Sequence, residues 1–239
     1  MATYANDQKS RAQLVNALGT LVQEGLTSGT SGNVSLRTGT GSMLITPTGV
    51  APDKLEPEHI VHMSVGGEVA DDQLTPSSEW RMHADIYRNK PGLEAVVHCH
   101  SNYATILACA HKPIPPIHYM LAAGGGYEVP LADYATFGSQ SLSDAALQAL
   151  ESSLACLLAN HGQLATGFTL EGALKLAQLV EEVAQWYWGV LAMGAEPQLL
   201  SREQMDEVLT AFATYGQQET RRDLAGGNRL PDHRGKETP

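Results

Sequence analysis

Long hydrophobic runs are missing from this sequence, since no stretch approaches the roughly 20 consecutive apolar residues of a membrane-spanning helix. Residues 1–15 also lack the basic start and the apolar block of a secretory signal. Cysteine is scarce: Cys99, Cys109 and Cys156 are odd in number and lie in apolar runs, which argues against a disulfide framework. We therefore expect a cytoplasmic protein that has no membrane partner.

Basic residues are also few, because 15 lysines and arginines face 26 aspartates and glutamates and leave a net charge of −11. The resulting field repels nucleic acid and anionic membranes, which argues against both as partners. An anionic substrate would need a locally favourable pocket. The sequence also has no P-loop motif, no glycine-rich dinucleotide fingerprint and no internal repeat, so the corresponding folds have no support.

What is present fits one globular core, because 43% of the 239 residues are apolar and 17% are charged. Apolar periodicity and capping residues predict helices within residues 9–25, 75–91, 102–110, 170–193 and 201–216. Alternating or continuous apolar runs predict strands within residues 28–37, 43–49, 60–65, 68–70, 93–100 and 154–162. We expect a single domain over residues 1–216, followed by a polar, mobile tail over residues 217–239.

The most informative residues are histidines at the ends of apolar runs. The period of two in a strand sends the rings of His98 and His100 to one face and the thiol of Cys99 to the other. His161 also lies where an apolar run meets a glycine, and Glu79 opens a helix. Three imidazoles with one carboxylate are a ligand set typical of zinc. Alternatively, the histidine pair faces solvent, and Glu79 is only a residue of the first helical turn whose charge the helix dipole stabilises.

Several short segments run in the order typical of one family. They are GTSGNVS (29–35), LITPTG (44–49), PSSEW (76–80), AVVHCH (95–100), PIPPIHYM (113–120), YATFG (134–138) and LLANHG (157–162). Together they resemble the class II aldolase/adducin family, and most closely its branch that cleaves L-fuculose 1-phosphate. The resemblance covers about residues 10–216, and SSEW, HxH and NHG together are far more specific than any one of them.

The resemblance implies an α/β fold, a three-layer α/β/α sandwich around a largely antiparallel central sheet, assembled as a cyclic homotetramer with sites between subunits. It implies that the zinc ligands are Glu79, His98, His100 and His161. It also implies that a substrate phosphate is bound by Asn33, Thr48, Gly49, Ser77 and Ser78, with Ser31 close by. Tyr119 is similar to a tyrosine that acts from a neighbouring subunit, and Phe137 and Tyr215 match an aromatic pocket and a tail position.

This ligand set suits an aldolase that splits a ketose 1-phosphate into dihydroxyacetone phosphate and an aldehyde. Breaking a carbon–carbon bond beside a carbonyl leaves a carbanion, which either a Schiff-base lysine or a Lewis-acidic Zn²⁺ can stabilise. Only Lys175 lies in an apolar helical stretch, and snorkelling explains its position. Glu79 then serves as resting ligand and general base. Tyr119 serves as proton donor to the aldehyde fragment, or else is a core aromatic residue.

Phosphate binding must rely on neutral donors, because no lysine or arginine stands in TSGN, TPTG or PSSE. Backbone N–H groups, hydroxyls and the start of the helix that follows Ser78 are suitable donors. A subunit contact is indicated by Trp186, Tyr187 and Trp188, which offer more aromatic surface than one core-facing stripe needs. An ordinary core helix is the alternative.

Other activities of the same family stay open. L-ribulose-5-phosphate 4-epimerases characteristically have Asp where this chain has Glu79, which favours the aldolase, yet SNYAT (101–105) resembles the epimerase branch. Dehydratases, decarboxylases and aldolases for 5-deoxyribulose or methylthioribulose phosphate share the metal ligands. A metal-free scaffold like the adducin head is disfavoured, because the ligand set and Tyr119 are intact.

Overall fold

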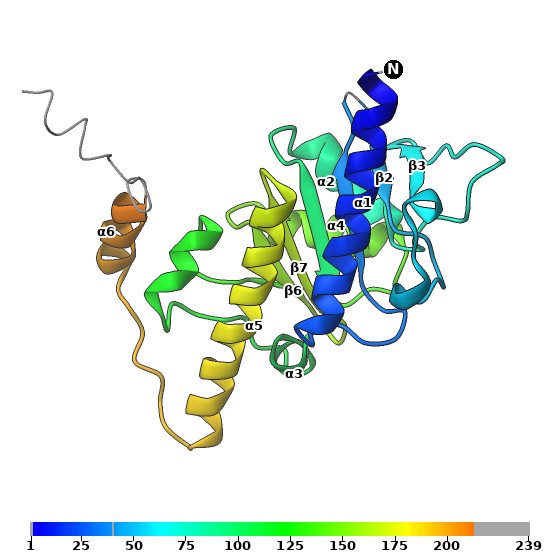
Figure 1. Ribbon diagram of the computed structural model, residues 1–239. Helices are drawn as coiled ribbons and strands as arrows, with labels where there is room; N and C mark the ends of the chain where they lie inside the picture. The colour runs from blue at the N-terminus through cyan, green and yellow to red at the C-terminus, as the bar shows by residue number, and fades with distance from the viewer. Residues whose placement is uncertain (1, 40, 213–239) are drawn as a thin grey trace, which may run out of the picture.

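The computed structural model describes residues 2–39 and 41–212 (Figure 1). The strands are β1 (Asn33–Arg37), β2 (Ser42–Ile45), β3 (Val61–Ser64), β4 (Ala95–Cys99), β5 (Leu131–Ala132), β6 (Ala155–Leu158) and β7 (Gly162–Gly167). The α-helices are α1 (Ala2–Gln23), α2 (Trp80–Asn89), α3 (Asn102–Cys109), α4 (Gln140–Ala149), α5 (Leu170–Ala192) and α6 (Arg202–Phe212). Short 3₁₀ helices are η1 (Pro52–Lys54), η2 (Pro57–His59) and η3 (Tyr119–Gly124). Tyr215 and the tail expected over residues 217–239 lie outside the described residues.

All these strands form one sheet in the order β3-β2-β1-β4-β7-β6-β5. Neighbouring strands are antiparallel from β3 to β6, whereas the edge strand β5 pairs with β6 in parallel. Helix α4 connects β5 to β6, and parallel neighbours need such a crossover. The predicted α/β class is therefore confirmed, but the parallel edge pair makes the sheet mixed.

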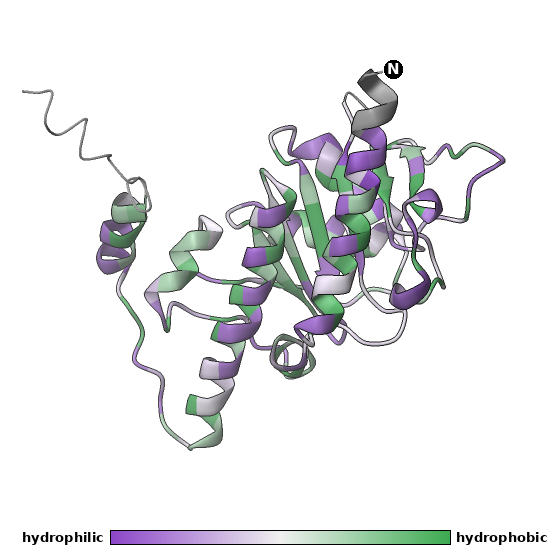
Figure 2. Ribbon diagram, in the orientation of Figure 1, coloured by the Kyte–Doolittle hydropathy of each residue, from purple (hydrophilic) through white to green (hydrophobic). Residues whose placement is uncertain are grey.

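The sheet is the middle layer of three. One hydrophobic cluster joins the sheet to α1, α3 and α5, and a second joins its opposite face to α2 and α4. Figure 1 shows α1 and α5 crossing in front of the strands. In Figure 2 the central strands are mostly apolar, while α1 and α5 mix polar and apolar residues along their length. This pattern is expected of a buried sheet covered by amphipathic helices, and it confirms the three-layer sandwich.

Strand β4 lies near the centre of the sheet and alternates between the two clusters. Val97 and Cys99 belong to the cluster beneath α5, whereas Val96 belongs to the cluster beneath α2. The strand period therefore turns His98 toward the α2 side. In the β1–β4 register His98 is paired with Asn33, which brings two polar residues together at the centre of the fold.

The sequence pattern does not indicate β7, although this strand lies between β4 and β6 and is entirely buried. Its polar residues hide it, because Gln163 and Thr166 interrupt the apolar run. Both make hydrogen bonds inside the fold, although Gln163 Oε1 has no hydrogen-bond partner among the described residues. Gln163 donates to Ser101 Oγ at 2.6 Å, and Thr166 donates to the carbonyl of Leu154 at 2.8 Å.

No helix within the described ranges combines the length and the apolar character needed to cross a membrane.

Candidate metal centre and active site

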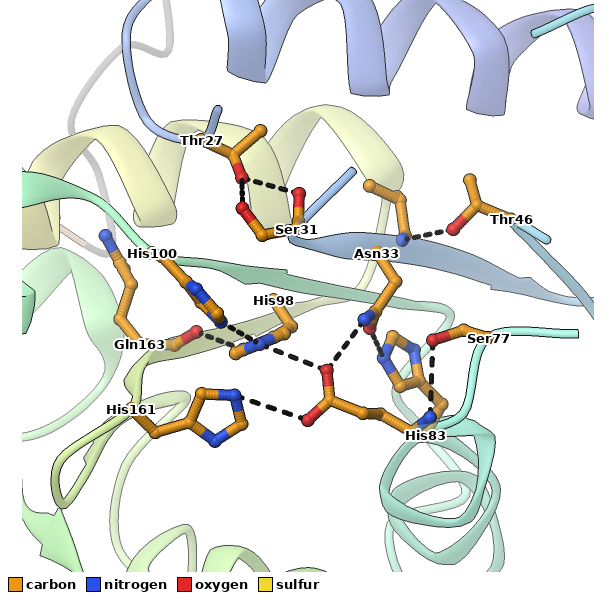
Figure 3. A network of polar contacts seen from close by, with 12 residues as sticks. Thr27, Ser31, Asn33, Thr46, Ser77, His83, His98, His100, His161 and Gln163 are labelled. Atoms are coloured by element: carbon orange, nitrogen blue, oxygen red, sulfur yellow. Dashed lines mark hydrogen bonds and ion pairs between the residues drawn. The ribbon is translucent and has the colours of Figure 1, made fainter. Parts of the chain in front are cut away.

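Three histidines from two connections of the sheet meet at one point. His98 is the penultimate residue of β4, His100 follows the strand, and His161 lies in the turn between β6 and β7. One ring nitrogen from each lies within 4.8 Å of the others, and the ring centroids are 4.7–4.9 Å apart. Figure 3 shows the three rings pointing toward one another. The three histidines therefore lie together as expected, and their role as metal ligands stays a prediction.

The turn that carries His161 requires a glycine after it. A Cβ on Gly162 would lie 2.5 Å from the carbonyl oxygen of Cys99 and 2.9 Å from the His100 ring. Any side chain at this position would push the two histidine-bearing segments apart. Asn160 precedes the histidine with a φ of 53°, a left-handed conformation that asparagine tolerates better than most residues.

The segment after His100 is held by a carboxylate from α5. Glu181 accepts hydrogen bonds from the backbone N–H groups of Tyr103 at 2.8 Å and Ala104 at 2.9 Å. These are orphan donors of the first turn of α3, and a carboxylate is a favourable acceptor there. The helix that packs across the sheet thus fixes the turn that presents His100.

Glu79 immediately precedes α2 and directs its carboxylate at the histidines. Its Oε2 accepts a hydrogen bond from Asn33 Nδ2 at 2.9 Å and lies 3.2 Å from His98 Nε2. Its Oε1 lies 3.4 Å from His161 Nε2. Glu79 is 6% exposed, so an almost fully buried carboxylate from a third part of the chain joins the three imidazoles.

These groups fit a cation. His98 Nδ1 donates to the carbonyl of Gln163 at 2.9 Å, so in a neutral ring the lone pair of Nε2 faces the Glu79 carboxylate. Two acceptors then lie opposite each other. Glu79 Oε1 is also buried and has no hydrogen-bond partner among the described residues. A divalent cation among these atoms would satisfy both groups, and three nitrogens with one carboxylate oxygen suit zinc.

The ionisation states favour metal binding. Burial lowers the pKa of His98 and His100, and together with the field of His98 it lowers the pKa of His161 to about 4. The imidazoles are therefore neutral near pH 7, which is the form that binds a metal. Burial raises the pKa of Glu79, but the fields of His98 and His161 and the Asn33 hydrogen bond outweigh it and hold this pKa below its ordinary value.

A cleft of about 320 Å³ opens beside this centre. Its lining comprises Thr30, Ser31, Gly32, Asn33, Pro47, Thr48, Ser77, Ser78, Glu79, His100, Tyr134, Ala135, Phe137, Asn160 and His161. Among these described residues there is no lysine or arginine, so donors to an anion are neutral. Gly49 follows Thr48 with a φ of 72° but is not in the lining.

Tyr119 does not lie in the cleft of its own chain. It is the first residue of η3, is 48% exposed, and stacks on Phe212 with ring centroids 6.5 Å apart. The residue that the sequence suggests as proton donor therefore lies on the surface of the single chain. Tyr215, the other aromatic residue expected near the site, lies outside the described residues.

Some lining residues were not singled out from the sequence. Thr30, Gly32, Tyr134 and Asn160 belong to segments whose neighbours were singled out, so adjacency was the available signal. His83 lies outside the cleft lining, and neither its spacing nor its neighbours in the sequence indicate a functional role. It is fully buried, and burial with the field of His98 lowers its pKa to about 3.

Comparison with known proteins gives a consistent result. Residues 12–188 match the model of the family "Class II Aldolase and Adducin N-terminal domain". Over 206 residues the chain is 47% identical to a 5-methylthioribulose-1-phosphate/5-deoxyribulose-1-phosphate aldolase of Rhodospirillum rubrum, covering 86% of this chain and 92% of that protein. Over 208 residues it is 44% identical to an L-fuculose phosphate aldolase of Escherichia coli O157:H7, covering 87% and 96%. A solved structure of L-fuculose 1-phosphate aldolase matches with a TM-score of 0.82 at 37% identity, covering 86% of this chain and 96% of that one.

Proposed function

The chain belongs to the class II aldolase and adducin family, and from this premise we propose that it is a zinc-dependent aldolase acting on a ketose 1-phosphate. The products are dihydroxyacetone phosphate and an aldehyde. The observation that carries the proposal is the meeting of three neutral imidazoles with the Glu79 carboxylate, whose Oε1 has no hydrogen-bond partner among the described residues, at the wall of a cleft lined by neutral donors.

Glu79, His98, His100 and His161 are the proposed metal ligands. A divalent cation held by them would polarise the substrate carbonyl and stabilise the negative charge that develops as the carbon–carbon bond breaks. Because the imidazoles are neutral, they leave the charge of that cation largely uncompensated. The distances of 3.2 and 3.4 Å from Glu79 to His98 and His161 support this assignment.

In the direction of carbon–carbon bond formation, which cleavage reverses, two protons move: the first is donated to the oxygen of the aldehyde, and the second is removed from the carbon of dihydroxyacetone phosphate by a base. We assign the second to Glu79, because this residue lines the cleft and its Oε1 lacks a hydrogen-bond partner among the described residues. The hydroxyls of Thr48, Ser77 and Ser78 are the proposed phosphate ligands, together with Ser31, Asn33 and the Gly49 turn. Their neutrality suits a site that must bind an anion beside the Glu79 carboxylate.

The first proton transfer is assigned to Tyr119 of a second copy of the chain. Tyr119 is half exposed and absent from the cleft of its own chain, so a neighbouring subunit has to present it. Trp186 and Trp188 on α5 are also partly exposed, at 37% and 39%, and burial of such rings is typical of an interface. A cyclic homotetramer with sites between subunits is the proposed assembly.

Replacing Tyr119 with phenylalanine is expected to keep the bound metal and to lower kcat by about 100-fold, as loss of a proton-transferring group does. Steady-state kinetics and a metal assay on the same sample measure both quantities. Tyr127→Phe is the matched control, because the Tyr127 hydroxyl donates a hydrogen bond to Asp206 and Tyr127 does not line the cleft. Normal turnover of Tyr119→Phe would remove the proton-donor role.

The substrate is expected among ketose 1-phosphates whose aldehyde part ends in an apolar group. Tyr134 and Phe137 line the cleft and are 63% and 66% exposed, which leaves their rings free to contact such a group. Three candidates come from the names of the relatives: L-fuculose 1-phosphate, 5-methylthioribulose 1-phosphate and 5-deoxyribulose 1-phosphate.

A coupled assay for released dihydroxyacetone phosphate, run on these three sugars, tests the proposal. We expect cleavage of at least one sugar, loss of cleavage after treatment with a chelator, and recovery when Zn²⁺ is added. Cleavage that resists chelation would contradict the metal-dependent mechanism. A chain that retains no divalent metal and cleaves none of the sugars would instead be a scaffold.

A further inference from the structure

A line of buried side chains runs from Glu79 into the interface between the sheet and α2. Asn33 Nδ2 donates to Glu79 Oε2 at 2.9 Å, and Asn33 Oδ1 lies 2.6 Å from His83 Nε2. Ser35 Oγ lies 2.7 Å from His83 Nδ1 and also 2.7 Å from the hydroxyl of Tyr87. Each of these five residues is at most 6% exposed, so solvent does not compete for their hydrogen bonds. Figure 3 shows His83 beside Asn33 at the edge of the histidine cluster.

The hydrogen bonds in this line have only one consistent direction. An ionised Glu79 can only accept, so the amide nitrogen of Asn33 faces it and Oδ1 faces His83. The neutral ring of His83 must then carry its hydrogen on Nε2. Its Nδ1 accepts from Ser35, and Ser35 in turn accepts from Tyr87.

The direction matters for Glu79. If the Asn33 amide were reversed, its carbonyl oxygen would face the carboxylate, and two acceptors would oppose each other between almost fully buried side chains. The donor on His83 prevents that reversal. The carboxylate consequently has one tethered oxygen, Oε2, and one oxygen without a hydrogen-bond partner among the described residues, Oε1.

We propose that His83 is a positioning residue for the metal centre. Through Asn33 it fixes the rotation of the Glu79 carboxylate and keeps Oε1 as the oxygen that binds the metal and transfers the proton. The inference rests on the proposed function only for the role of Glu79 as ligand and base. A purely structural role, filling the space between α2 and the sheet, predicts instead that any side chain of similar volume suffices.

His83→Phe and His83→Gln separate the two roles. Phenylalanine fills the space but has no donor, whereas glutamine places an amide N–H near the position of Nε2. Loss of a group that orients a metal ligand typically costs about 10- to 100-fold in activity or metal affinity. We expect His83→Phe to lower kcat and Zn²⁺ affinity by that amount with KM changed less than about threefold, and His83→Gln to restore most of both.

Zn²⁺ affinity, measured by competition with a chromophoric chelator, tests the positioning role of His83 without any sugar substrate. The inference therefore stays testable even if the assigned reaction is wrong. Thr166→Val is the matched control, because it removes a buried side-chain hydrogen bond on β7 that does not involve this line. It is expected to lower Tm while leaving kcat and Zn²⁺ affinity within about twofold.

A folded His83→Phe whose Zn²⁺ affinity and kcat match the wild type would overturn the inference. So would a His83→Gln variant that is as impaired as His83→Phe. If His83→Phe does not fold, Ser35→Ala takes its place, because it removes the donor that holds His83 Nδ1 as an acceptor. A drop in Zn²⁺ affinity and kcat at constant KM then supports positioning, and unchanged values contradict it.

Discussion

Replacing His98 with alanine is expected to remove the bound metal and to lower the rate of sugar-phosphate cleavage by more than about 100-fold. Loss of a residue that only orients a metal ligand already costs up to about 100-fold, and loss of the ligand itself should cost more. His98 is fully buried between β1 and β7, where solvent water has no ready access to replace its nitrogen. Its Nε2 lies 3.1 Å from His100 Nε2 and 3.2 Å from Glu79 Oε2, so it is the atom that joins the other ligands. Elemental analysis and the coupled assay measure the two losses on one preparation.

The control for this variant is His62→Ala. His62 lies on the edge strand β3 with an exposed side chain, outside the cleft lining. It is expected to keep both metal and turnover. Because His98→Ala also loses the hydrogen bond from Nδ1 to Gln163 and leaves a cavity, Tm has to be followed as well. A folded His98→Ala protein that holds a full complement of metal and turns over normally would refute the proposed centre.

The histidine cluster could be predicted because each member lies beside a local signal. The alternation of β4 fixes the faces of His98 and His100, and a shift of one residue would turn both rings into the opposite core. The glycine after His161 marks a close approach between two segments, which the 2.5 Å separation at Gly162 explains. Local periodicity and one small residue therefore indicated which histidines could meet, whereas the resemblance to the family implied that they bind a metal together with Glu79.

The line from Glu79 to His83 could not be predicted in the same way. Asn33 reaches the centre because β1 pairs with β4 in a register that sets it opposite His98. His83 reaches Asn33 because α2 packs its buried face on the same side of the sheet. Both relations depend on tertiary packing between segments distant in sequence, and a single buried histidine on a helix gives no sign of its partner.

The same limit applies to β7 and to Tyr119. Strand β7 is buried by neighbours on both sides, and its polar residues make hydrogen bonds to distant segments, so its sequence need not look apolar. Tyr119 is exposed in the single chain. Its proposed role depends on an assembly, and neither periodicity nor the packing of one chain contains that information.

Replacing Glu79 with glutamine is expected to lower kcat by about 10²- to 10⁴-fold, the contribution of a general base, while the three imidazoles still hold the metal with reduced affinity. Glutamine keeps the length of the side chain, and its carbonyl oxygen can still accept from Asn33 Nδ2, where Oε2 accepts at 2.9 Å in the wild type. It cannot take up a proton near neutral pH, so the variant removes proton transfer and little of the geometry. Steady-state kinetics and chelator competition on the same preparation separate the two effects.

The two possible failures of this experiment have different meanings. If metal and turnover disappear together, Glu79 acts mainly as a ligand, and the assignment of the base fails while the metal centre stands. If turnover persists, the proton is moved by another group, and Oε1 without a hydrogen bond has to be explained by metal binding alone. Retained metal with lost turnover is the result expected if one carboxylate has both roles, because only the proton-accepting role requires a charge that glutamine lacks.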